Sequence, residues 1–90
     1  MGTNRNVNSF IKLKIIRKYD FKCLYCGHIG SQKNYLTVDH VFPKHLGGTN
    51  SQENLACCCK ECNGKKGSML LTDYIKKYKI DVSWDIANFL

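Results

Sequence analysis

The sequence predicts a small α+β domain with two short strands between helices, and three observations lead to this fold class. Ninety residues are enough for one domain with a modest core. Apolar side chains recur at helical spacing near both ends, whereas two short apolar runs with turn signals lie between them. The chain has six cysteines, four of them in two C-x-x-C pairs that could bind a stabilising metal ion. Below ~70–80 residues a hydrophobic core alone rarely stabilises a fold, and this chain is only slightly longer.

The first element is expected to be a helix over residues 7–20. Residues 11–15 also alternate as a strand would, but the length of the pattern favours the helix. The apolar residues at four-residue spacing are Val7, Ile11, Ile15 and Tyr19.

Two strands and a loop follow. Residues 35–41 and 53–59 have the length and composition of short strands, and the segment between them, 43–52, contains the turn residues Pro43 and Gly47-Gly48. Because a proline and two glycines interrupt it, we expect an irregular loop between an adjacent pair of strands.

Three helices are expected after the second strand, over residues 60–67, 68–80 and 83–90. Gly67 should end the first, Ser68 or Thr72 should begin the second, and Ser83 should cap the last. The aromatic residues of the last two helices are expected in the core: Tyr74, Tyr78, Trp84 and Phe89.

Charge and polarity restrict the setting and the partner. Fourteen Lys and Arg against seven Asp and Glu give a net charge of +7, which suits a polyanionic partner, although a generic basic protein would look the same. No apolar run approaches the ~18–20 residues of a membrane span, and the polar start lacks the apolar stretch of a signal peptide. We therefore expect a reducing cytoplasm and no membrane partner. Paired cysteines there bind metal more often than they form disulfides.

The two cysteine pairs predict a structural zinc site. Each C-x-x-C turn can bring two sulfurs to one tetrahedral ion, and four thiolates leave no open position for chemistry. The four expected ligands are Cys23, Cys26, Cys59 and Cys62, with buried free cysteines as the alternative. Cys57 and Cys58 are expected in the core of the second strand. The segment between the pairs is longer than in a simple zinc ribbon, and it contains the adjacent Asp39 and His40.

"LTVDHVFPKHLGGTNSQENL" followed by "CKECNGKKG" resembles the HNH endonuclease family, which has the ββα-metal fold. The likeness covers about residues 20–68 of a single domain expected over 1–90. The family's third histidine is replaced here by Asn63, which resembles the HNN variant. The matching positions are Asp39, His40, Pro43, Gly47, Gly48, Asn54, the two cysteine pairs, Asn63 and Lys66.

The resemblance and the chemistry of phosphodiester hydrolysis imply a role for each polar residue. His40 is expected as the general base on water, while Asp39 and Asn63 offer oxygen ligands for Mg²⁺ or Mn²⁺. Asn54 is expected to tether the loop and fix His40. Lys65 and Lys66 are expected to contact the DNA backbone. Each position also has a structural alternative. Asp39 and His40 could be a surface pair at a strand end, and Asn54 could be a turn residue. Asn63 could cap a helix, and the two lysines could lie on a solvated helix face.

The resulting hypothesis is a metal-dependent endonuclease that hydrolyses DNA in a bacterial or phage-infected cell, alone, as a homodimer or with an accessory protein. One alternative is a zinc-stapled DNA-binding module without catalysis, which the asparagine at position 63 keeps open and the Asp39-His40 pair weighs against. The other is a zinc-stapled protein-interaction module, which the positive charge weighs against.

Overall fold

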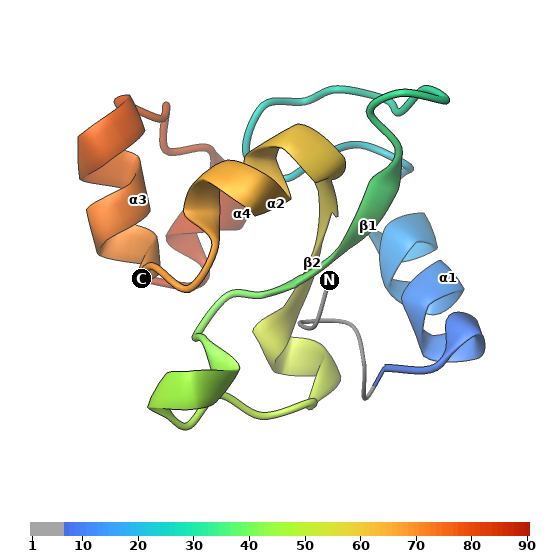
Figure 1. The fold of residues 1–90 in the computed structure, drawn as a ribbon, viewed down its shortest axis with the longest axis horizontal. Coiled ribbons are helices and arrows are strands. Elements are labelled where there is room, and N and C mark those ends of the chain that lie inside the picture. Colours follow the sequence, from blue (N-terminus) through green and yellow to red (C-terminus); the bar gives the residue numbers. More distant parts are fainter. Residues whose placement is uncertain (1–6) are drawn as a thin grey trace.

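The computed structural model describes residues 7–90, and its elements follow the predicted order (Figure 1). The first six residues, which belong to the polar start, lie outside the described residues. The helices and strands are α1 (Ser9–Lys18), β1 (Leu36–His40), β2 (Leu55–Cys59), α2 (Lys60–Lys66), α3 (Leu71–Tyr78) and α4 (Trp84–Ala87). Two short 3₁₀ turns, η2 (Lys44–Leu46) and η3 (Gln52–Asn54), lie in the loop between the strands. The α+β fold class is confirmed, whereas a single domain over 1–90 stays a prediction.

The two strands form an antiparallel pair in which Asp39 lies opposite Ala56 and His40 opposite Leu55. Because successive side chains on a strand point to opposite faces, Asp39 and His40 leave the sheet in different directions. This register puts the candidate pair at the end of β1, where the chain enters the long loop that leads to β2.

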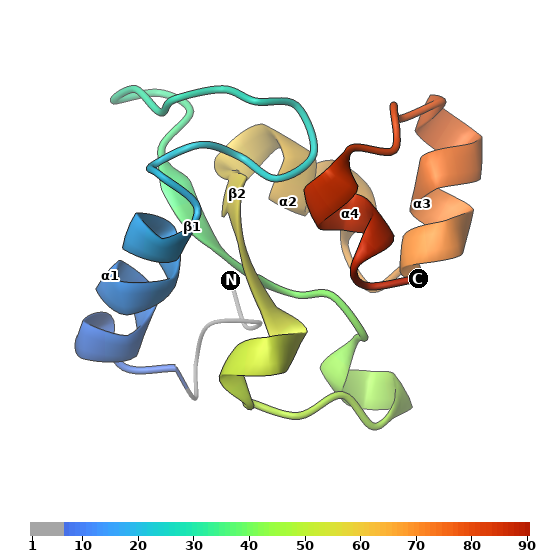
Figure 2. The ribbon, with the colours of Figure 1, turned by 180° about the vertical axis from the view of Figure 1, so that it is seen from behind.

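Helices cover both faces of the strand pair (Figures 1 and 2). On one face α1 contributes Ile15, which packs with Val38 and Leu55. On the other face the strands, the first cysteine pair and the C-terminal helices share a larger cluster that includes Tyr74 and Ile86. The predictions that Tyr78 and Trp84 belong to the core are wrong, because their side chains are 37% and 82% exposed.

The helix ends show which local signals operate. Ser83 caps α4 by accepting a hydrogen bond from the Ile86 amide at 3.2 Å, and Gly67 ends α2, both as predicted. The expected start of α3 at Ser68 or Thr72 is wrong, since the residue before its first turn is Leu70, which provides no side-chain cap. No helix in the described part of the chain is long and apolar enough to cross a membrane.

Candidate functional site

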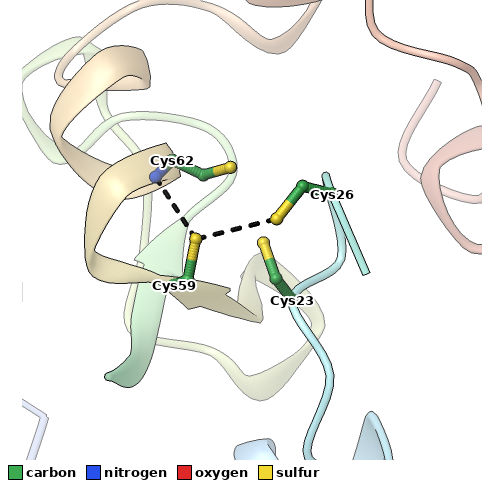
Figure 3. Close-up of side chains that lie close together, drawn as sticks. All are labelled: Cys23, Cys26, Cys59 and Cys62. Carbon is green, nitrogen blue, oxygen red and sulfur yellow. Dashed lines mark hydrogen bonds between the residues drawn. The ribbon is translucent and has the colours of Figure 1, made fainter. Parts of the chain in front are cut away.

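The four cysteines of the two C-x-x-C pairs converge, as Figure 3 shows. Their sulfur atoms all lie within 4.8 Å of one another, and those of Cys26 and Cys59 are 3.7 Å apart. A tetrahedral zinc with Zn–S bonds of about 2.3 Å separates its sulfurs by roughly 3.8 Å. The cluster therefore has the donor atoms and the spacing for one metal ion such as zinc.

Local backbone geometry builds each half of this cluster. In the first pair the Cys23 amide donates to the His28 carbonyl at 2.8 Å, and Gly27 closes the turn with a φ of 79° that favours glycine. The Leu24 amide donates to the Cys57 carbonyl at 2.8 Å, which fastens the turn to β2. In the second pair the Cys59 sulfur caps α2 by accepting from the Cys62 amide.

The thiols of the cluster cannot all ionise without a cation. A hydrogen bond from Cys62 lowers the pKa of Cys23 to about 4, and burial opposes this shift. Burial raises the pKa of Cys26 to about 11, and the hydrogen bond with Cys23 raises the pKa of Cys62. Crowded sulfurs that resist joint ionisation are what a divalent cation would stabilise as thiolates.

Cys57 and Cys58 are fully buried core residues, as predicted. Burial raises the pKa of Cys57 to about 12 and also raises that of Cys58. Neither belongs to the converging set of sulfurs. Both therefore stay protonated and act as small apolar side chains.

The carboxylate of Asp39 is buried and held on one side only. Its Oδ2 atom accepts hydrogen bonds from the Tyr25 hydroxyl at 2.7 Å and from the Lys66 ammonium at 3.1 Å. Burial raises the pKa of Asp39, and the charge of Lys66 opposes that shift. The second oxygen, Oδ1, is buried and has no hydrogen-bond partner among residues 7–90.

Lys66 lies inside the protein and not on its surface. Its side chain is 1% exposed, and its ammonium donates to the His40 carbonyl at 3.1 Å as well as pairing with Asp39. A buried charge is tolerated when it is paired and hydrogen-bonded in this way. From the sequence we expected Lys66 to contact the DNA backbone, but in the structure its ammonium is buried and holds Asp39 and the end of β1.

His40 is only 2% exposed, and its two ring nitrogens differ in their surroundings. Nε2 lies 2.7 Å from the side-chain oxygen of Asn50, whereas Nδ1 is buried and has no hydrogen-bond partner in the described part of the chain. The sequence did not single out Asn50, since a loop asparagine ten residues after a histidine has no periodic relation to it. Tyr25 was missed in the same way, because its position inside a C-x-x-C pair indicates only a zinc turn.

The amide of Asn54 ties together the two ends of the loop between the strands. Its Oδ1 accepts from the Phe42 amide at 2.8 Å, while its Nδ2 donates to the carbonyls of Phe42 at 3.1 Å and Thr49 at 2.9 Å. All of these groups lie within the segment that leaves β1 after His40. The tether expected of this asparagine is thus present.

The remaining two candidates lie on α2. Asn63 is half-buried one turn before Lys66, and its side chain makes no hydrogen bond within residues 7–90. Lys65 is exposed, with its ammonium 5.7 Å from the centre of the Tyr78 ring. Lys66 thus contacts both the Asp39 carboxylate and the main-chain carbonyl of His40. Asn63 lies one turn before Lys66 on the same helix.

Unpartnered polar atoms are concentrated at the Asp39-His40 pair. Across residues 7–90, three buried side-chain atoms lack a hydrogen-bond partner, namely His28 Nε2, Asp39 Oδ1 and His40 Nδ1. Buried polar atoms are nearly always satisfied, so two such atoms on neighbouring residues indicate a site that is completed by something bound.

Comparison with known proteins is consistent with this geometry. A family model described as HNH endonuclease matches residues 23–79, more than half of the chain. The Septu protein PtuB of Bacillus thuringiensis is 36% identical over 62 residues, which are 66% of this chain and 24% of that protein. The chain thus spans about a quarter of that relative's length.

A solved structure shares the fold. The Type II-C Cas9 enzyme from Actinomyces naeslundii superposes with a TM-score of 0.64 and 26% identity, over 74% of this chain and 7% of that one. The residues that the family model matches include the cysteine pairs and the Asp39-His40 pair. The family model, with its residues matched from the first cysteine pair to the end of α3, assigns the chain to the HNH endonuclease family.

Proposed function

We propose that this chain is an endonuclease that hydrolyses DNA phosphodiester bonds with a divalent metal ion, separate from a structural zinc. One observation carries the proposal: Asp39 and His40 each have one polar atom engaged by the protein and one buried atom without a partner. A hydrolytic site needs a metal ligand and a proton acceptor, and these two atoms would supply them from adjacent residues.

The metal-binding part of the site consists of Asp39 and Asn63. Asp39 Oδ1 and the side-chain oxygen of Asn63 are the hard donors that Mg²⁺ and Mn²⁺ prefer, and neither has a hydrogen-bond partner within residues 7–90. A bound cation would supply neutralisation of the charge on the phosphate and on the leaving oxygen. Tyr25 and Lys66 hold the other oxygen of Asp39, so that Oδ1 keeps a fixed direction.

The proton-accepting part is His40. Its Nδ1 is the free ring nitrogen, and it would take a proton from the attacking water. Because the side chain is 2% exposed, cleavage would require its surroundings to open enough to admit water and a phosphate. The tether of Asn54 holds the loop that follows β1.

The zinc has a different task. Four sulfurs around one ion leave no coordination position for water or phosphate, so the zinc would stabilise the fold and take no part in hydrolysis. Cys26 is the exposed cysteine of the set, and its sulfur points toward the other three. Metal chemistry is thus divided between two ions of different kinds.

The substrate and partners follow from charge and from the relatives. A net charge of +7 favours a polyanion, and the exposed Lys65 would neutralise a phosphate of the backbone. The relative named Septu protein PtuB is about four times longer than the matched segment. We propose an accessory protein as one partner of this chain. A homodimer is the other arrangement that the chain would use, and the cytoplasm is its proposed location.

Plasmid nicking tests the proposal directly. Zinc-loaded protein is incubated with supercoiled plasmid and Mg²⁺ or Mn²⁺, with and without brief exposure to EDTA. We expect nicking with the added metal and loss of nicking with EDTA, while bound zinc and far-UV circular dichroism persist and fresh Mg²⁺ restores activity. DNA binding without nicking by the wild type would instead indicate a non-catalytic binding module, and neither activity would indicate a protein-interaction module.

A further inference from the structure

We propose that Asn50 is the positioning residue for His40: its side-chain oxygen accepts the Nε2 proton and thereby leaves Nδ1 as the proton acceptor. The inference rests on the proposed function of the same site and adds to it the residue that decides which ring nitrogen reacts. Asn50 lies in the loop between the strands, four residues before Asn54.

The contact itself determines the tautomer. Nε2 of His40 and Oδ1 of Asn50 are 2.7 Å apart, which is within hydrogen-bond distance. An amide oxygen can only accept, so the proton of a neutral imidazole must lie on Nε2. Nδ1 then has a bare lone pair, and no protein group in residues 7–90 occupies it.

The position of Asn50 is fixed by hydrogen bonds that the residues on either side of it, Thr49 and Ser51, make with Asn54. The Thr49 carbonyl accepts from the Asn54 side chain at 2.9 Å, and the Ser51 carbonyl accepts from the Asn54 amide at 2.8 Å. Before them, Gly48 lies so close to Phe42 that a Cβ atom would clash with the Phe42 carbonyl. Asn54 would thus act on the imidazole indirectly, by fixing the residues on either side of Asn50.

A merely structural role for Asn50 makes different predictions. Asn50 is an exposed residue apart from its contact with His40, and the loop around it is already held by Asn54. If Asn50 only fastened the loop, its removal would lower stability and DNA affinity together. If it positions the imidazole, its removal lowers the rate of the chemical step and leaves binding intact.

Three variants of the zinc-loaded chain separate these roles. Asn50→Ala should lower kcat about 10–100-fold, as loss of an orienting partner does, with KM for DNA and zinc content unchanged. Asn50→Asp keeps an acceptor at the same place and should restore most of the rate. Gln52→Ala, an exposed change in the same loop, should cleave like the wild type.

The ring nitrogens of His40 give a readout that does not depend on cleavage. In ¹⁵N-labelled wild-type protein, the nitrogen shifts should show Nε2 protonated, and in Asn50→Ala they should show a mixture of tautomers. A wild-type protein with Nδ1 protonated, or an Asn50→Ala variant with wild-type kcat, overturns the inference while leaving the proposed nuclease intact. If the wild type cleaves no DNA, the proposed function fails, and the nitrogen shifts alone decide whether Asn50 sets the tautomer.

Discussion

The cysteine cluster and the Asp39-His40 pair lie close to the same strand pair but are built on opposite plans. In the cluster, four sulfurs from two chain segments turn toward one point and leave nothing free. In the pair, each side chain has one atom bound by the protein and one buried atom without a partner. This difference suggests a way to tell a structural site from a ligand-binding one. A site whose donor atoms can all bind one ion stabilises the fold, whereas a site with buried polar atoms that lack partners can still bind a ligand.

Tyr25 joins the two regions. It lies between Cys23 and Cys26, and its hydroxyl donates to Asp39 at 2.7 Å. Its ring also packs edge-on against Tyr74, with centroids 5.2 Å apart. The turn that contains the first cysteine pair thus helps to hold the Asp39 carboxylate. Substitutions in the cysteine cluster should therefore also disturb the Asp39-His40 pair, whereas substitutions in the pair should leave the cluster intact.

The largest expected effect comes from the cluster itself. Cys62→Ser should abolish tight zinc binding and unfold the domain, since structural zinc contributes about 10–16 kcal/mol in small modules. Zinc analysis and far-UV circular dichroism measure both. Cys57→Ser, in an equally buried cysteine outside the cluster, should keep zinc and cost only about 1–3 kcal/mol. A folded Cys62→Ser protein with full zinc content would refute the structural role that we assign to the cysteine cluster.

The next largest effect should come from the reactive pair. His40→Ala should lower DNA cleavage by about 10²–10⁴-fold, the usual contribution of a general base, and keep zinc, fold and DNA affinity. Nicking rates and filter binding measure the two properties. His45→Ala removes an exposed imidazole from the same loop and should cleave normally. Cleavage by His40→Ala at the wild-type rate would mean that the base lies elsewhere.

The link between the regions should give an intermediate effect. Tyr25→Phe removes one hydrogen bond to a buried carboxylate and should lower the free energy of unfolding by about 1–3 kcal/mol with zinc retained. Cleavage should fall less than in His40→Ala, because Lys66 still holds Asp39. The matched control is Tyr35→Phe, at a tyrosine that is 52% exposed, and it should change neither property. Equal stability of the two variants would show that Tyr25 does not couple the regions.

The smallest effect should come from the surface. Lys65→Ala should weaken DNA binding by a few-fold and reduce the slope of log affinity against log salt by about 0.9, as one lost phosphate contact does. Titrations at several salt concentrations measure this slope. Lys12→Ala, on α1 across the sheet, should leave the slope unchanged if DNA approaches from the α2 side. Equal losses in both variants would indicate binding by net charge alone.

Much of the fold could be predicted because its signals are local. The C-x-x-C pairs, the strand lengths, Gly67 at the end of α2 and the Ser83 cap depend on residues within a few positions of one another. The predicted start of α3 and the predicted burial of Trp84 were wrong, since both depend on packing between segments. Apolar character in a short terminal helix does not by itself say which side is covered.

The sequence alone determined the family motif, the four cysteines that could hold a metal such as zinc, and the adjacency of Asp39 and His40, because these are properties of residue type and spacing. Only the tertiary structure decided which atoms of the pair are engaged. The residues that contact the pair lie 14, 10 and 26 positions away along the chain and are Tyr25, Asn50 and Lys66, respectively. Contacts over such separations have no periodicity in the chain, and they arise only when the loop and α2 fold back over the end of β1.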